Sequence, residues 1–345
     1  MARVYGLYSH IQKNRIKSVF LLASFVLLIH AVLFSLVLLF EAGTYGGTAQ
    51  EILEAAVEDV RYAWPAGLIA AGLWFLIAYA FHQRMIDYAT RAAGVERRAE
   101  PRLYNTLENL CISRGVAMPK LKIIETEGLN AFASGIRDSN YSVAVTRGLL
   151  DQLSERELAA VLGHELTHIR NKDTQLMVVA VIFAGIIAFV ADIMFRRLDF
   201  PFGYSPQPRR SSDRGRRESG GGGAAVLIIV IALAVIAISW GVSVLIRFAI
   251  SRSREFLADA GSVELTKDPD AMISALRRIE KGAAIPDVPS RVHAFFIESP
   301  AAEPERGWLS THPSVAARIH ALVEFAGGRD IGHEPLVAQP KGPWS

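Results

Sequence analysis

Cysteine is nearly absent from this sequence, which has one, Cys111, among 345 residues. A single thiol cannot form an intrachain disulfide, and it also excludes any metal site built from several cysteines. A reducing compartment is therefore allowed, although the cysteine count does not require one. We expect Cys111 to be a small side chain of a buried core, with a redox role as the alternative.

A strong charge of either sign is also missing. The chain has 37 Lys and Arg against 34 Asp and Glu, a net charge of +3. So weak a bias does not indicate nucleic acid, and we predict no such partner; the basic residues lie beside apolar segments and suit a lipid surface better. Mean hydropathy is +0.26 although 21% of the residues are charged, so the apolar residues must be clustered.

Four long apolar runs account for this hydropathy. A membrane-spanning helix needs roughly 20 apolar residues, and each run is long enough to supply one. The first run is too long for the apolar core of a cleavable signal peptide, and no small-residue cleavage site follows it closely. We therefore predict four transmembrane helices, in residues 19–40, 63–81, 176–195 and 224–246.

The charges beside these runs predict an orientation. Residues 1–18 are basic and contain no acid, the loop 41–62 is acidic, and arginines follow residue 82. The positive-inside rule then places the N-terminus and residues 82–175 in the cytoplasm. The loop 196–223 has seven Arg against three acids, although four crossings would place it outside. The alternative is that the last two runs form a hairpin that does not fully cross; the loop itself has the composition of a disordered linker.

Two polar blocks, 82–175 and 247–345, remain for a folded domain. Residues 121–125 and 141–145 have the composition of short strands, and 130–135 is a third extended candidate, which we interpret as an ordinary edge strand or loop. Ser154 and Glu157 form a capping-box pattern that predicts the start of a helix. The apolar side of that helix would carry Leu158, Val161, Leu162, Leu166 and Ile169.

The sequence His-Glu-Leu-Thr-His at 164–168 lies on this predicted helix. Residues four apart share one helical face, so His164 and His168 can bind a single ion through their rings, and neutral imidazole suits zinc. Glu165 lies beside that position and can take a proton from an attacking water. This pattern is typical of zinc metalloproteases. The alternative is a surface helix with two histidines by accident.

A third histidine at the spacing HExxHxxGxxH is also missing, since Ile169, Arg170 and Asn171 follow the motif. A catalytic zinc usually has three protein ligands, so one must come from elsewhere. The best candidate is Glu255 in the segment 253–259, with Asp259 four residues later able to hold a ligating imidazole. The alternative is a solvent-facing helix of mixed charge.

His312 precedes an apparent helix that contains Arg318 and His320. A histidine or arginine near the zinc could stabilise the oxyanion of a tetrahedral intermediate, so we include His312 as a catalytic candidate. The alternative is a capping or loop residue.

Four segments in this order, between apolar runs, carry a resemblance to a known family: NAFASG (130–135), HELTH (164–168), REFLAD (254–259) and LSTHPS (309–314). Over about residues 5–325 the chain resembles the HtpX family of membrane zinc metallopeptidases. The resemblance implies one zinc per chain, bound by His164, His168 and Glu255, with Glu165 as the base. It also implies a multi-pass protein of the bacterial inner membrane with a cytoplasmic catalytic domain, acting in stress-related quality control on misfolded or damaged membrane proteins.

The expected fold is therefore a mainly α membrane protein with four transmembrane helices and a zincin-like α+β metallopeptidase domain with a small sheet. The domain boundaries follow the runs: a membrane hairpin 1–81, the first catalytic part 82–175, a second hairpin 176–246 with the linker 196–223, the second catalytic part 247–325 and a tail 326–345. Its partners would be the bilayer and membrane-protein or unfolded polypeptide substrates; the oligomeric state is open. The rival functions are a zinc-binding membrane scaffold without catalysis and a metallohydrolase acting on something other than protein.

Overall fold

A computed structural model describes residues 7–44, 48–182, 185, 221–286, 288–299 and 312–330. The chain divides into two compact units. One, here the α+β unit, consists of Met1–Lys17, Ala80–Val181 and Arg247–Ser345; the other, the helical unit, consists of Ser18–Tyr79 and Ile182–Ile246. Most of the predicted run 176–195 lies outside the described residues, as do residues 196–220 of the linker and the tail after residue 330.

A mixed four-stranded sheet with the order β1-β2-β4-β3 forms one layer of the α+β unit. Its strands are β1 (Ala93–Gly94), β2 (Lys120–Ile124), β3 (Ala131–Ser134) and β4 (Ser142–Thr146). β2 and β4 are parallel, whereas β1 pairs with β2 and β3 with β4 in antiparallel fashion. The predicted strands are confirmed, with the two longer ones displaced by one residue.

The predicted third extended segment, 130–135, contains the edge strand β3. Its free edge is closed in part, because Phe132 bridges Phe296 and the Ile297 N–H donates to the Ala131 carbonyl at 2.9 Å. Asn130 reinforces this link by donating from Nδ2 to the Glu298 carbonyl at 2.9 Å and to the Ala283 carbonyl at 3.0 Å. β3 is thereby connected to two segments that come more than 150 residues later in the chain.

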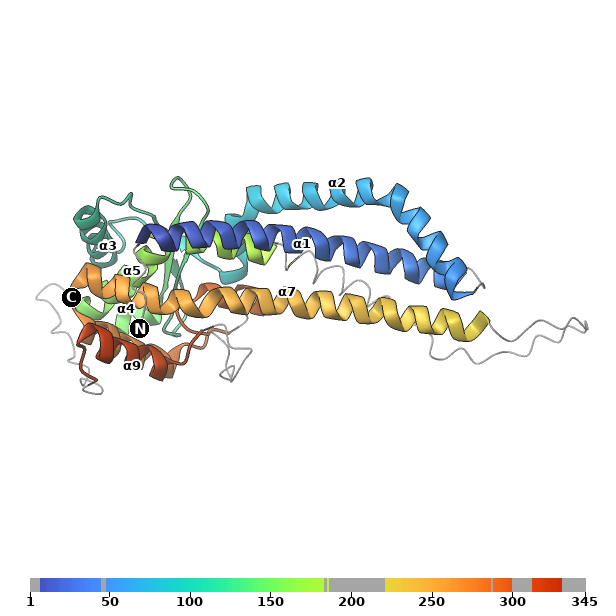
Figure 1. Cartoon of the computed structure of the whole chain (residues 1–345). Helices are drawn as coiled ribbons and strands as arrows, with labels where there is room; N and C mark the ends of the chain where they lie inside the picture. Colours follow the sequence, from blue (N-terminus) through green and yellow to red (C-terminus); the bar gives the residue numbers. More distant parts are fainter. Residues whose placement is uncertain are drawn as a thin grey trace, which may run out of the picture. The chain divides into compact units, whose positions relative to one another are not determined.

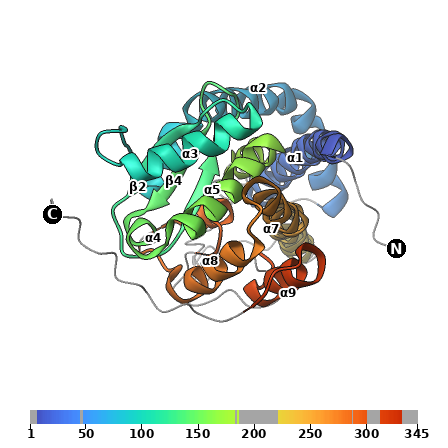
Figure 2. The same cartoon turned by 90° about the vertical axis from the view of Figure 1, so that its left-hand side faces the viewer.

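Helix α5 (Glu155–Arg170) lies at the centre of the α+β unit. It packs against α3 (Pro101–Arg114), α8 (Pro269–Gly282) and β3. Figure 2 shows α5 between α3 and α8. Three more elements lie wholly within this unit, namely α4 (Arg147–Gln152), the 3-10 helix η1 (Ser290–Phe295) and α9 (Val315–Ala326). All five residues predicted for the apolar side of α5 are buried in one core: Leu158, Val161, Leu162, Leu166 and Ile169.

Cys111 is buried in the same core, as predicted. Burial, together with the nearby Glu108 carboxylate, raises the pKa of its thiol to about 11. The thiol is therefore protonated at neutral pH, which makes it a poor nucleophile and favours the core interpretation over a redox role.

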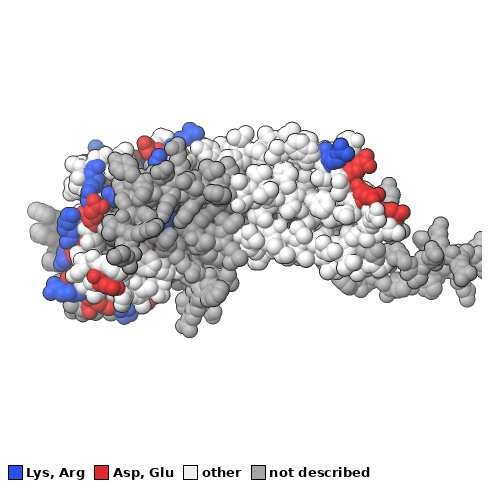
Figure 3. Space-filling model, viewed as in Figure 1, with Lys and Arg blue, Asp and Glu red and all other residues white. Residues whose placement is uncertain are grey.

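Three long helices, α1 (Leu7–Thr44), α2 (Ala49–Thr90) and α7 (Gly221–Thr266), run through the helical unit (Figure 1). Within this unit they meet in an apolar cluster that contains Ala42, Ala56 and Ala232, whose small side chains let helices approach closely. The visible described surface of the unit is uncharged over its middle (Figure 3). Such a surface suits a lipid environment.

Two stretches of the described residues are long and apolar enough to cross a membrane, Val26–Thr44 and Ala49–Thr90. The stretch found in the last predicted run, Val226–Val242, is shorter. The mainly helical fold with a small mixed sheet is confirmed, while the expected total of four transmembrane helices stays a prediction.

Candidate metal centre

The capping box predicted from the sequence begins α5. The Ser154 hydroxyl accepts from the Glu157 N–H at 3.4 Å, and the Glu157 carboxylate accepts from the Ser154 N–H at 2.8 Å. This start fixes the helical register of the next three turns, so His164 and His168 fall on one face. Their Nε2 atoms lie 3.1 Å apart, His164 being fully buried.

Helix α7 brings Glu255 to this pair. Its Oε2 lies 3.6 Å from Nε2 of His164, and its Oε1 lies 3.6 Å from Nε2 of His168. One ligand atom from each of the three side chains lies within 4.8 Å of the others. The segment 254–259 is helical, as predicted, and belongs to the same helix as the apolar stretch that precedes it.

Close contact between α5 and α7 makes this meeting possible. The Ser262 hydroxyl of α7 donates to the Ala160 carbonyl of α5 at 2.5 Å. A Cβ atom added to Gly261 would overlap with the Thr167 side chain, and one added to Gly163 would approach Ser262 Oγ at 3.3 Å. The two glycines therefore let the helix backbones approach at the level of the histidines.

Two further carboxylates hold the histidines from behind. Nδ1 of His164 lies 2.9 Å from Asp259, and Nδ1 of His168 lies 3.2 Å from Asp173. A neutral imidazole that donates from Nδ1 keeps its lone pair on Nε2, the atom that faces the centre. Carboxylate partners of this kind orient metal-binding histidines in proteins.

The donor set fits a divalent cation. Two Nε2 lone pairs and the carboxylate of Glu255 converge in a buried space. These electron-rich atoms repel each other unless a cation or a proton lies between them. Burial lowers the pKa of His164, but hydrogen bonds to Asp259 and Glu255 outweigh it and raise the pKa to about 9. Metal binding would displace this proton, as it does at other imidazole sites.

Arg318 of α9 supports this arrangement from the side of Asp259. Its side chain is fully buried and donates twice to the Asp259 carboxylate, from Nη2 at 2.6 Å and from Nε at 2.9 Å. Nη1 donates to the Ile297 carbonyl at 2.8 Å and lies 3.6 Å from Oε2 of Glu255. The guanidinium is thus anchored behind the centre, whereas the sequence had suggested Arg318 only as a possible oxyanion partner.

Glu165 is buried, and neither carboxylate oxygen has a hydrogen-bond partner among the described residues. It lies near the backbone of Ala133 in β3. Burial raises the pKa of Glu165, which the electrostatic influence of His164 and His168 only partly offsets. A buried carboxylate with free lone pairs and a raised pKa has the properties of a proton acceptor.

The loop before α9 places His312 at the same centre. It is buried, and its Nδ1 lies 3.5 Å from Oε2 of Glu255. His320 lies further on, within α9. Its side chain is 78% exposed and pairs with Glu324 at 3.5 Å. Of these two histidines, His312 alone contacts the candidate ligands.

Sequence reasoning missed Asp173. The residue comes five positions after His168, beyond the end of α5, where Lys172 has a left-handed φ of 59°. This turn redirects the chain, so Asp173 lies beside His168. The sequence does carry a signal, an acid shortly after the second histidine at a helix end, but the helical spacing rule does not extend past that end.

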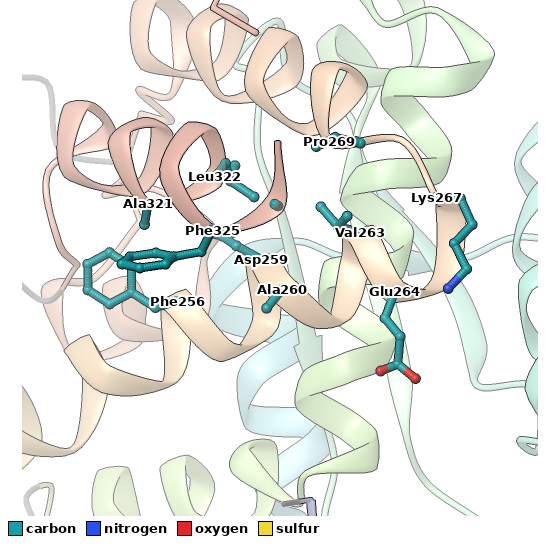
Figure 4. A pocket seen from close by; sticks show the side chains of 11 residues that line it. Phe256, Asp259, Ala260, Val263, Glu264, Lys267, Pro269, Ala321, Leu322 and Phe325 are labelled. Atoms are coloured by element: carbon teal, nitrogen blue, oxygen red, sulfur yellow. The ribbon is translucent and has the colours of Figure 1, made fainter. Parts of the chain in front are cut away.

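A cavity of about 720 Å³ lies between α7 and α9. Phe256 and Phe325 lie together at one end, and Glu264 and Lys267 lie at the other (Figure 4). Of the residues of the metal centre, only Asp259 is among those that line it. The cavity is thus separate from the converging donor atoms.

Comparisons with known proteins agree with this geometry. The model of peptidase family M48 matches residues 97–326. A protease HtpX homolog of Bacteroides fragilis is 38% identical over 263 residues, covering 73% of this chain and 77% of the relative. A protease HtpX homolog of Leuconostoc citreum is 33% identical over 316 residues, covering 92% and 99% respectively.

A crystal structure of S. mikatae Ste24p is similar with a TM-score of 0.40 and 16% identity, covering 74% of this chain and 56% of that one. A likeness at this level assigns no residue. The resemblance to HtpX proteases that the four sequence segments indicated is confirmed by the family model and by the two homologs.

Proposed function

The chain belongs to peptidase family M48 and is a membrane-associated metalloprotease, and from this premise we propose that one zinc ion per chain is bound by His164, His168 and Glu255. The observation that carries the proposal is the convergence of these three side chains, with each histidine held from behind by a carboxylate. Imidazole nitrogen and carboxylate oxygen in a buried three-ligand set favour zinc over harder cations.

The bound metal supplies a Lewis acid that polarises the scissile carbonyl and makes water nucleophilic at neutral pH. Glu165 then has a defined task for its free carboxylate oxygens, which is to accept a proton from the attacking water and deliver it to the leaving amine. Its raised pKa suits this exchange because it reduces the cost of protonating the carboxylate.

Three other residues would prepare the centre. Asp259 fixes the tautomer of His164, and Arg318 holds Asp259 by two hydrogen bonds. His312, buried beside Glu255, is the candidate to stabilise the oxyanion that develops on the carbonyl. These three roles are inferred from the positions of the side chains. Substituting one residue at a time tests each role independently of the other two.

We further propose that the protein crosses the bacterial inner membrane several times, with the α+β unit in the cytoplasm. The acidic segment 41–62, most of which belongs to the ends of α1 and α2, and the basic segments beyond the two apolar runs support this orientation. The substrates would be polypeptides, as for any protease, and by the resemblance described from the sequence they would be misfolded or damaged membrane proteins.

Replacing the proposed base tests the function directly. In purified protein with zinc, Glu165→Gln should lower hydrolysis of casein by about 10²–10⁴-fold, because the amide cannot accept the proton. Bound zinc should stay near the wild-type level, since the ligands are unchanged. Glu155→Gln is the matched control, an exposed acid in the first turn of the same helix, and should leave the rate unchanged.

Two results would contradict the proposal. Casein degradation by Glu165→Gln at the wild-type rate would favour a scaffold that only binds metal. Turnover of small acyl-amides with every protein substrate untouched would favour a metallohydrolase of another class. A substrate-trapping comparison in membranes with the same variant would then identify the natural substrates.

A further inference from the structure

The last three turns of α2, residues 80–90, present two different faces within the α+β unit. On one face His82, Ile86 and Thr90 are buried. On another, Phe81, Met85 and Tyr88 are 47%, 54% and 89% exposed. The spacing of four and three residues puts these three large side chains on one stripe.

The face turned away from this stripe is bonded to the sheet. The Asp87 carboxylate accepts from Lys122 Nζ of β2 at 2.5 and 2.6 Å. Gln83 donates to the hydroxyl of Ser134 in β3 at 3.1 Å. These bonds fix the rotation of the helix about its axis, so the fold itself keeps the stripe exposed.

The spacing of aromatic residues along α2 indicates what covers the stripe. Trp64 and Tyr88, 46% and 89% exposed, lie 24 positions apart in this one helix, which corresponds to about 36 Å of helix axis. A bilayer has a hydrocarbon core of about 30 Å and a thickness of about 40–45 Å with its headgroups. Trp and Tyr concentrate in the two headgroup layers, so a helix with Trp64 in one layer has Tyr88 in the other.

We infer that the stripe formed by Phe81, Met85 and Tyr88 is a lipid-contact surface of the α+β unit, lying in the headgroup layer of a phospholipid bilayer. The stripe lies in the last turns of a helix apolar enough to span a membrane, Ala49–Thr90. Arg84 lies on its border with the guanidinium carbon 5.7 Å from the centre of the Phe81 ring. An arginine above an aromatic ring at the end of an apolar stretch can reach lipid phosphate.

The inference rests on the proposed membrane crossing, and it has a consequence for the proposed protease activity. Gln83 and Asp87 link the lipid-facing turns to β3 and β2, and β3 lies beside Glu165. The membrane surface would therefore be tied to the strand next to the candidate base. Polypeptide segments that have just left the bilayer are the substrates such an arrangement favours.

Spin labels at single cysteines test the inference in a Cys111→Ala background, reconstituted into phospholipid nanodiscs. Labels replace Phe81, Met85 and Tyr88 in turn. Leu73, 55% exposed on the same helix, calibrates the bilayer interior, and Ile112, 72% exposed on α3, calibrates water. Accessibility to oxygen, which concentrates in lipid, is compared with accessibility to a water-soluble nickel chelate.

The expected result is a graded depth, with positions 81, 85 and 88 between the two calibration sites and 88 nearest the water. A nickel accessibility at positions 85 and 88 equal to that of Ile112 would overturn the inference. Spin–spin broadening at these positions, lost when each disc holds one chain, would assign the stripe to a second copy instead. Repeating the measurement with Glu165→Gln separates it from catalysis, so a failure of the proposed protease mechanism would leave the depths unchanged.

Discussion

At the scale of single residues, Glu255 is the proposed ligand that most needs a direct test, because it comes from a helix far along the chain from the two histidines. Replacing it by alanine removes one of three converging ligand atoms. We expect Glu255→Ala to bind well below one zinc per chain, measured by metal analysis after dialysis against a weak chelator. Glu264→Ala, which alters another acid of the same helix, should retain full stoichiometry. Retained zinc in Glu255→Ala would remove this residue from the ligand set.

Asp259 and Arg318 form a buried ion pair, and breaking it leaves a buried cation without its carboxylate. Asp259→Asn should lower the free energy of unfolding by about 3–5 kcal/mol, seen as a lower midpoint in thermal denaturation. Zinc affinity should fall about 10–100-fold in a chelator competition, since His164 loses its partner. The control, Asp330→Asn, breaks the half-exposed pair with Arg277 and should cost less than about 1 kcal/mol. Equal effects of the two changes would argue against a supporting role for Asp259.

Much of the candidate site could be predicted at this scale, for a physical reason. His164, Glu165 and His168 lie within one helical turn, so spacing alone decides their mutual geometry. Asp173 and the anchoring of Arg318 could not be predicted, because a left-handed turn at Lys172 and the packing of α9 place them. Both depend on tertiary structure that no local rule describes.

At the scale of elements, the crossing of α5 and α7 depends on Gly261. A methyl group there would overlap with Thr167, so Gly261→Ala should separate the helices and move Glu255 away from the histidines. We expect a loss of about 1–3 kcal/mol in stability and a clear fall in bound zinc. Gly241→Ala lies on the same helix, with nothing within 4 Å of the added methyl group, and should be neutral or slightly stabilising. Unchanged zinc in Gly261→Ala would mean that the crossing can adjust without harming the centre.

The strands and the start of α5 were predictable because their signals are local, namely alternation, β-branched residues and a capping box. The order of the strands was not, since the position of β4 between β2 and β3 depends on pairing. The link from Asn130 to the segment around Glu298 is likewise a contact across 168 residues.

At the scale of the whole molecule, the proposed topology can be read by chemical labelling in a Cys111→Ala background. In intact cells, a membrane-impermeant maleimide should label Glu54→Cys, in the acidic segment proposed to lie outside. It should not label Glu264→Cys in the α+β unit until the cells are opened. Labelling of Ser211→Cys from outside would support four crossings, and protection would support a hairpin that does not cross. Labelling of Glu264→Cys in intact cells would reverse the proposed orientation.

The distance in sequence between His164 and Arg318, which is 154 residues, also sets an order of events during synthesis. The ribosome makes the HELTH helix long before it makes Glu255, and Glu255 before α9. A growing chain therefore carries the two histidines and the base for most of the second half of translation without the residues that complete the centre. Activity would be delayed until the last described helix has been released, which protects the nascent chain and its neighbours from premature cleavage.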